Sequence, residues 1–290
     1  MSAAEKGYAG AYRFLLEKYE KSPERYGPQT LYFLACLAGG AGMPEKALEW
    51  LRRAVLDNGW WYRPEVLEDD DLSSIKSAPE FISLKSASDE RYAAAVSKSK
   101  AVFTWESKSA DNLFLAVHGN GQNRQTARED WEPLLGGKSR WQLETIQSAE
   151  PDGYGTYRWS YNMESCAPVA NAIEKMQNIG YTKIVCGGFS AGCDMLLRSI
   201  VFTPARCDIL ILQSPWISIL QDHSEGLVNA FKQKNIALRI LCGSDDEDCL
   251  PMAKQLFEVT IREGIHAEIA IQEGNRHQFP KESFALQDLL

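Results

Sequence analysis

The sequence lacks the features that would place it in a membrane, on nucleic acid or in a disulfide-bonded scaffold. No apolar run among its 290 residues reaches the roughly 20 needed to span a bilayer, and its N-terminus has no signal-peptide shape. The chain has no excess of basic residues: a net charge of −8 and a pI of about 5.2 argue against nucleic-acid binding. The seven cysteines are odd in number, so we expect reduced, buried thiols and a cytoplasmic protein.

The most informative motif is Gly-x-Ser-x-Gly at residues 188–192. Residues 183–186 before it predict a short β-branched strand, and residues 193–200 after it predict a helix. Strand, pentapeptide and helix together are typical of a nucleophile elbow, in which small residues permit a tight turn that exposes the serine hydroxyl. Ser190 is therefore the candidate nucleophile, and the N–H of Ala191 is a candidate oxyanion donor. A glycine-rich turn of this kind can instead bind phosphate.

Histidine is scarce, which narrows the search for a general base. A serine needs such a base, and in this arrangement the chain order is serine, acid, histidine. His277 lies in a loop after the alternating segment 266–271, which predicts a strand, and this is where the base is expected. His266 is predicted to be a strand residue on a solvated face, and His223 to lie in a polar loop, so both are weaker candidates.

The candidate acid follows another predicted strand, residues 237–242. This strand ends in Gly243 and a run of acidic residues, any of which could orient the histidine. Hydrolases with this layout usually carry the acid three residues after the strand-end glycine, which favours Asp246. Asp248 is the second choice and Asp245 the third.

The second oxyanion donor is predicted upstream of the elbow. The buried strand expected at residues 112–117 runs into His118-Gly119-Asn120, a His-Gly loop that suits close approach of backbone to substrate. The N–H of Asn120 is the candidate donor, and His118 is expected to hold the loop. A metal site at His118 is not favoured, because no second His or Cys lies at ligand spacing.

These motifs, in this order, make residues from about 100 to 290 resemble the phospholipase/carboxylesterase branch of the α/β-hydrolases, which includes acyl-protein thioesterases. Other matches lie along the chain: Trp131, Ser160-Tyr161, Gln213-Ser214-Pro215 and Phe279-Pro280. The resemblance implies a mostly parallel sheet with helices on both faces, and a serine esterase or thioesterase that needs no cofactor or metal. The chain departs from the family at Ala191 and Cys193, where relatives often carry Gln or Gly. Pro251 lies one position later than expected, which leaves Asp246 and Asp248 both open.

The first hundred residues predict helices instead. We expect one over residues 8–20, a second after Gly27-Pro28 and a third from Pro44. The spacing of small and apolar residues resembles a tetratricopeptide-like helix pair; the positions are Leu31, Leu34, Ala35, Ala47, Leu51 and Ala54. Only one such unit is visible and stable arrays need three or more, so we expect it to pack against the other domain or a protein partner.

The predicted organisation is thus a helical region at 1–97 and an α/β-hydrolase domain at 98–290. The predicted activity is hydrolysis of small carboxylic esters or thioesters by Ser190, His277 and Asp246 through an acyl-enzyme. Two alternatives remain: a serine peptidase of the same fold, and a tetratricopeptide-type binding protein with a vestigial hydrolase domain.

Overall fold

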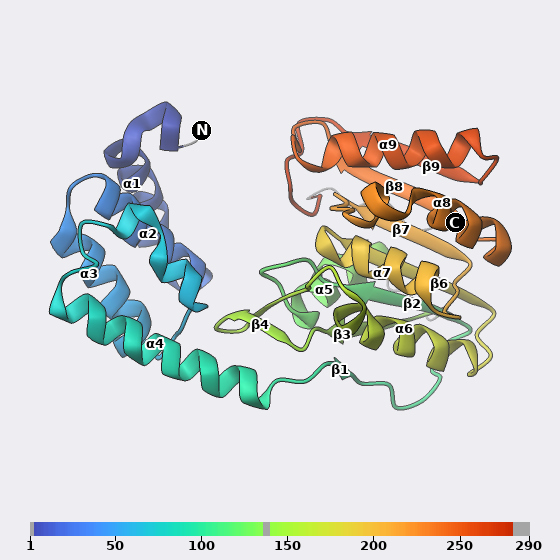
Figure 1. Cartoon of the computed structure of the whole chain (residues 1–290), viewed down its shortest axis with the longest axis horizontal. Coiled ribbons are helices and arrows are strands. Elements are labelled where there is room, and N and C mark those ends of the chain that lie inside the picture. Colours follow the sequence, from blue (N-terminus) through green and yellow to red (C-terminus); the bar gives the residue numbers. More distant parts are fainter. Residues whose placement is uncertain (1–2, 136–139, 281–290) are drawn as a thin grey trace. The chain divides into compact units, whose positions relative to one another are not determined.

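A computed structural model describes residues 3–135 and 140–280, which form two compact units (Figure 1). The first unit comprises Met1–Ser99 together with Pro151–Gly155 from the middle of the chain. The second comprises Lys100–Glu150 and Thr156–Leu290. Among the described residues, no helix has both the length and the apolar character needed to cross a bilayer.

The first unit is built from four α-helices and several short helical turns. Prolines occupy the first position of three of the α-helices, where a missing N–H costs nothing. The elements are α1 (Ala3–Lys21), η1 (Pro23–Arg25), α2 (Pro28–Gly40), α3 (Pro44–Arg52), the π-helical η2 (Arg53–Asp57), η3 (Pro64–Glu68), η4 (Asp70–Leu72) and α4 (Pro79–Lys98).

The core of this unit lies between α2, α3 and the helical turns that follow. The six apolar positions that suggested a helix pair are all buried: Leu31, Leu34, Ala35, Ala47, Leu51 and Ala54. The sequence of residues 73–99 is polar and shows only patches of helical pattern, yet α4 is one continuous helix of 20 residues. Its buried residues are only Phe81, Leu84 and Ser88, so most of the helix shows no apolar period that could reveal it.

Two adjacent tryptophans of the first unit pack against the segment Pro151–Gly155. The rings of Trp60 and Trp61 each lie 6.4 Å from that of Tyr154. The Tyr154 N–H donates to the carbonyl of Trp61 at 3.0 Å, and Arg63 forms an ion pair with Asp152 at 3.3 Å. The aromatic pair therefore has a packing role within this unit.

The second unit contains a seven-stranded sheet with the order β1-β3-β2-β6-β7-β8-β9. β1 pairs with β3 in the antiparallel sense, and every other neighbouring pair is parallel. The strands are β1 (Val102–Phe103), β2 (Asn112–Val117), β3 (Trp141–Gln147), β6 (Lys183–Phe189), β7 (Ile209–Gln213), β8 (Ala237–Gly243) and β9 (Ala267–Gln272). A separate two-stranded sheet contains β4 (Glu150–Gly153) and β5 (Thr156–Arg158).

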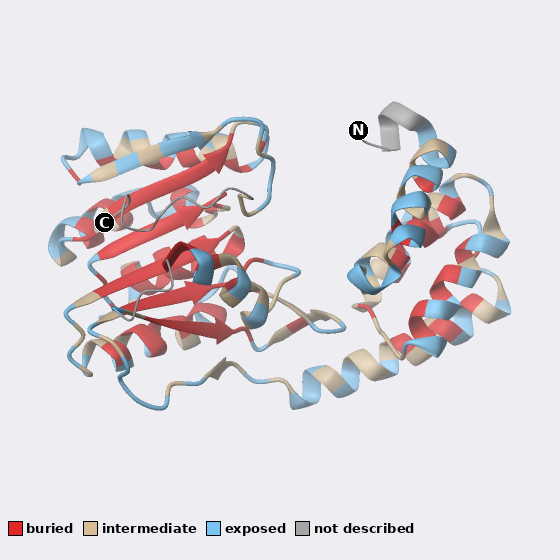
Figure 2. Cartoon of the chain, turned by 180° about the vertical axis from the view of Figure 1, so that it is seen from behind, coloured by how far each residue is buried: buried red, intermediate tan, exposed pale blue. Residues whose placement is uncertain are grey.

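Both faces of the large sheet are covered, which makes its inner strands almost wholly buried (Figure 2). Alternate residues of β2 show the two sides: Leu113 and Leu115 belong to one core cluster, and Phe114 belongs to the other. The helices are α5 (Arg124–Trp131), η5 (Glu132–Leu135), α6 (Met163–Gln177), α7 (Ala191–Phe202), α8 (Ile219–Lys234) and α9 (Cys249–Arg262). The α5 residues join the Phe114 cluster, whereas residues of α6 to α9 join the other. The predicted mostly parallel sheet with helices on both faces is confirmed.

One local prediction differs from the structure, and the edge strand is short. β1 covers only Val102–Phe103, because it pairs only along the outer edge of β3. His223, expected in a loop, lies within α8 at a kink (φ −138°, ψ 32°), where its ring meets Phe202 at 5.0 Å. His266 lies immediately before β9 and is exposed.

Candidate active site

The turn between β6 and α7 places Ser190 at the carboxyl end of a central strand. Ser190 has φ 51° and ψ −124°, a conformation that few non-glycine residues adopt. The positions two residues before and after Ser190 must be glycine, because a side chain at either would clash with neighbouring backbone. A Cβ at Gly188 would lie 2.8 Å from the Cys193 nitrogen, and one at Gly192 would lie 2.6 Å from the carbonyl oxygen of His118. The turn is therefore tight on both sides of the serine.

His277 follows β9 and reaches Ser190 across the end of the sheet. Its Nε2 lies 2.9 Å from Ser190 Oγ, and its Nδ1 lies 2.9 Å from Asp246 Oδ2. The imidazole packs against Phe189, with ring centroids 5.3 Å apart, while its own side chain is 42% exposed. Serine hydroxyl, imidazole and carboxylate thus form one continuous chain of hydrogen-bonding atoms.

Burial separates the competing acids after β8. Asp246 is only 2% exposed, whereas Asp245 and Asp248 are exposed. Asp246 Oδ1 accepts the N–H of Cys249 at 3.2 Å, which leaves Oδ2 facing the imidazole. At the end of β8, a Cβ at Gly243 would lie 2.1 Å from the Asn275 carbonyl oxygen, so only glycine lets the two loops approach this closely.

The two predicted oxyanion donors lie beside Ser190. Ala191 begins α7 directly after the serine, and Gly119, next to Asn120, has its hypothetical Cβ 3.1 Å from Ser190 Cβ. Among the described residues, neither the Asn120 N–H nor the Ala191 N–H has a hydrogen-bond acceptor. Unpaired N–H groups at this position are able to receive an oxyanion.

His118 is wholly buried and holds the loop that carries Asn120. The Ser148 N–H donates to its Nε2 at 3.1 Å, so Nδ1 carries the proton and donates to the Gly119 carbonyl at 2.8 Å. Burial lowers the pKa of His118 to about 4 and keeps the ring neutral. Trp159 covers the ring at a centroid distance of 4.9 Å.

Two residues that secure this loop gave no signal in the sequence. Gln122 Oε1 accepts the Gly119 N–H at 2.8 Å. The Trp159 N–H donates to Asn120 Oδ1 at 2.8 Å, and its indole N–H donates to the His118 carbonyl at 2.8 Å. The role of Trp159 depends on the segment after β5 meeting the loop, a contact between distant residues that no spacing motif reveals.

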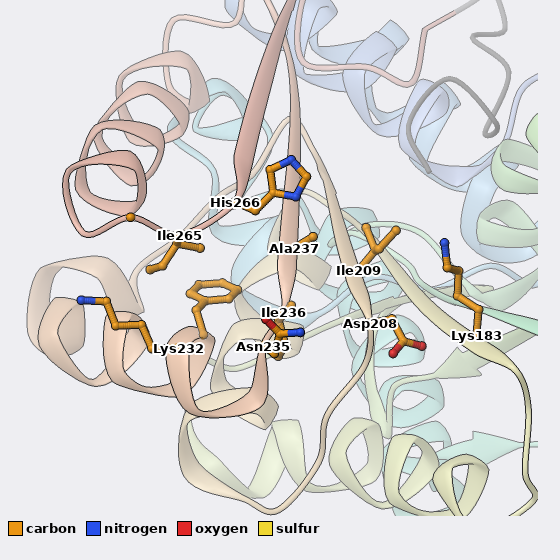
Figure 3. A pocket seen from close by; sticks show the side chains of 11 residues that line it. Lys183, Asp208, Ile209, Lys232, Asn235, Ile236, Ala237, Ile265 and His266 are labelled. Atoms are coloured by element: carbon orange, nitrogen blue, oxygen red, sulfur yellow. The ribbon is translucent and has the colours of Figure 1, made fainter.

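A cavity of about 520 Å³ lies at the opposite end of the strands (Figure 3). Lys183 and Ala237, which begin β6 and β8, line it together with Asp208, which precedes β7. Two of its charged groups already have partners: Asp208 accepts the Ile184 N–H at 2.7 Å, and Lys232 pairs with Glu263 at 2.8 Å. This cavity is separate from the Ser190 site, which forms at the carboxyl ends of the strands.

Fold and site together define a protein with the α/β-hydrolase fold and a serine, a histidine and an aspartate in hydrogen-bonding contact. Residues 1–96 match the family model described as the A/B hydrolase-like, N-terminal domain. This description does not identify the helices as tetratricopeptide repeats, and that part of the resemblance stays a prediction.

Two solved structures, given first below, show the same fold. An uncharacterized protein from Bacillus cereus ATCC 10987 is 25% identical, with a TM-score of 0.53; the alignment covers 96% of this chain and 90% of that chain. Esterase PE8 is 15% identical, with a TM-score of 0.50 and coverage of 63% and 92%. Acyl-protein thioesterase 2 of Zea mays is 14% identical, with a TM-score of 0.44 and coverage of 66% and 96%. The resemblance to the α/β-hydrolases is confirmed; a search of curated proteins found no match.

Proposed function

We propose that this chain is a serine hydrolase that cleaves carboxylic esters or thioesters through an acyl-enzyme. One observation carries the proposal: Ser190 Oγ, the His277 imidazole and Asp246 Oδ2 are joined by two contacts of 2.9 Å. Contacts of this length permit direct proton transfer between serine and imidazole. The esterase and thioesterase names among the structural neighbours agree with this chemistry.

In the proposed reaction, Ser190 Oγ attacks the acyl carbonyl while His277 Nε2 takes its proton. The buried Asp246 accepts the Nδ1–H, which fixes the tautomer and stabilises the imidazolium that forms. The N–H groups of Asn120 and Ala191 stabilise the tetrahedral oxyanion, and one such donor is typically worth about 3–4 kcal/mol. His277 then protonates the leaving alcohol or thiol, and water releases the acyl group by the same steps.

A neutral imidazole at His118 supports this role of the Asn120 loop. Its two ring nitrogens bind the Gly119 carbonyl and the Ser148 N–H, so the ring acts as a fixed spacer under the loop. Trp159 adds a second anchor through Asn120 Oδ1. The loop is thereby held before substrate arrives, and preorganised donors stabilise an oxyanion without reorganising.

The test is labelling of the full chain with a fluorophosphonate, comparing wild type with Ser190→Ala. Wild type is expected to label and to hydrolyse short acyl esters or acyl thioesters. Ser190→Ala is expected to lose labelling and on the order of a million-fold in turnover, as in other serine triads. Substantial hydrolysis by a folded Ser190→Ala protein, or no labelling of folded wild type, would contradict the proposal.

A further inference from the structure

A cysteine lies against the histidine and aspartate of the candidate active site. Cys249, the first residue of α9, is fully buried, and its Sγ lies 3.4 Å from His277 Nδ1. The same Nδ1 lies 2.9 Å from Asp246 Oδ2, and single donor atoms of all three residues lie within 4.8 Å of one another. Nothing in the proposed reaction uses this thiol.

We propose that Asp246, Cys249 and His277 form a binding site for a thiophilic divalent cation, Zn²⁺ or Cd²⁺. Thiolate, imidazole and carboxylate are the donors that zinc takes in proteins. In a tetrahedral zinc site, sulfur and nitrogen ligands lie about 3.5 Å apart, as these do, and nitrogen and oxygen about 3.3 Å apart. The 2.9 Å contact would widen by only a few tenths of an ångström.

Charge balance suits the buried position of this site. A divalent cation, one thiolate, one carboxylate and a neutral imidazole sum to zero, which lowers the cost of burying the ion. Binding releases the Cys249 thiol proton to solvent, and no oxidation or reduction takes place. Cys249 and Asp246 are buried, whereas the His277 side chain is 42% exposed, so the ion enters from the imidazole side.

Metal at this site inhibits the enzyme through the tautomer of His277, an effect that rests on the proposed function. The cation takes the Nδ1 lone pair, so the ring proton moves from Nδ1 to Nε2. A protonated Nε2 cannot accept the Ser190 proton, and Asp246 no longer accepts a proton from Nδ1. The serine then loses its base without any change in the elbow.

Cd²⁺ binding to the full chain tests the site without reference to activity. Wild type is expected to show the ultraviolet thiolate-to-cadmium charge-transfer band on titration, and Cys249→Ala is expected to lose it. Cys242→Ala is the matched control, because Cys242 Sγ also approaches Asp246, at 3.9 Å, but does not belong to the three-donor group. A band retained in Cys249→Ala, or lost only in Cys242→Ala, would overturn the proposal.

Inhibition by Zn²⁺ is the second readout, with each variant normalised to its own metal-free rate of fluorophosphonate labelling. The Zn²⁺ concentration that halves labelling is expected to rise at least tenfold in Cys249→Ala and to stay close to wild type in Cys242→Ala. Unchanged inhibition in Cys249→Ala would refute the inhibitory site. His277→Ala is also expected to weaken the cadmium band, because the imidazole is one of the three ligands. A wild-type protein that shows the cadmium band but takes no fluorophosphonate label would refute the serine hydrolase and leave the metal site standing.

Discussion

Ser190 occupies a backbone conformation that costs about 1–3 kcal/mol for a residue with a side chain. Hydrogen bonds from the Ser190 backbone N–H and carbonyl to other residues hold it in this conformation. The Ser190 N–H donates to the Gln213 carbonyl at 3.0 Å, and the Ser190 carbonyl accepts from Cys193 at 3.0 Å and from Trp216 at 3.3 Å. The nucleophile is therefore fixed by the end of β7 as well as by its own turn.

At the same scale, the choice of acid is testable by two isosteric substitutions. Asp246→Asn is expected to lower kcat for ester hydrolysis by about 10⁴, because an amide does not stabilise the imidazolium or fix its tautomer. Asp248→Asn, at an exposed position without a side-chain cap hydrogen bond, is expected to stay within a few-fold of wild type. Equal losses in the two variants would remove Asp246 from its proposed role.

Among the elements, α7 does more than present the serine, because it also anchors the start of α8. Asp194 and Arg198 form a buried ion pair at 2.5 Å within α7. Asp194 Oδ1 accepts the Ile219 N–H at 2.8 Å, and Arg198 donates to the Ser218 hydroxyl at 3.0 Å. Removing one partner of such a pair leaves an unpaired buried charge, so we expect either substitution to destabilise the packing of α8 against α7.

Two glycines, one in each unit, give predictions of opposite sign for the effect of alanine on stability. A Cβ on Gly39 would lie 2.2 Å from the Asp71 carbonyl oxygen, so Gly39→Ala is expected to destabilise α2 by about 1–3 kcal/mol. Gly226 in α8 has only an ordinary contact, 3.4 Å from Val201, and Gly226→Ala is expected to stabilise by up to about 1 kcal/mol.

Hydrogen exchange of the full chain, resolved by peptide, measures both effects. Protection of α2 amides should fall in Gly39→Ala, and protection of α8 amides should rise or stay equal in Gly226→Ala. Equal protection of α2 in wild type and Gly39→Ala would show that the backbone of Asp71 moves aside without cost.

Across the whole molecule, buried titratable groups set how stability changes with pH. Burial lowers the pKa of His118 to about 4, so unfolding takes up a proton between pH 6.5 and 4 and stability falls as pH falls through that window. Burial raises the pKa of Asp130 to about 6 and raises that of Glu144, and these carboxyls act in the opposite direction. The dependence of the free energy of unfolding on pH is therefore the sum of these opposing contributions.

Substitution isolates the histidine contribution. His118→Asn is expected to be less stable than wild type at pH 7, with a difference that shrinks on acidification below pH 6.5 by up to about 1.4 kcal/mol per pH unit. Urea unfolding of both proteins between pH 7 and 4.5 measures the difference. A difference that does not change with pH would mean that His118 does not titrate on unfolding in this range.

The sequence by itself determined the elements that carry the site and the order of the candidate residues along them. Short apolar runs identified the strands, and glycines around Ser190 identified the turn, because these preferences act between near neighbours. The strand predicted at residues 112–117 has those bounds in the structure. The predicted helix from Pro44 likewise begins at that residue. Whether residues 1–97 bind a protein partner stays a prediction.

Only the tertiary structure decided which of several adjacent acids meets His277. Asp245, Asp246 and Asp248 are the same residue type and lie close together in the sequence. Burial against the His277 loop distinguishes Asp246 from the other two, which are exposed. The same holds for Trp159 and Cys249, whose contacts join segments far apart in the sequence. Such contacts depend on how loops pack together at the carboxyl ends of parallel strands. Local sequence preferences act between near neighbours and therefore do not predict them.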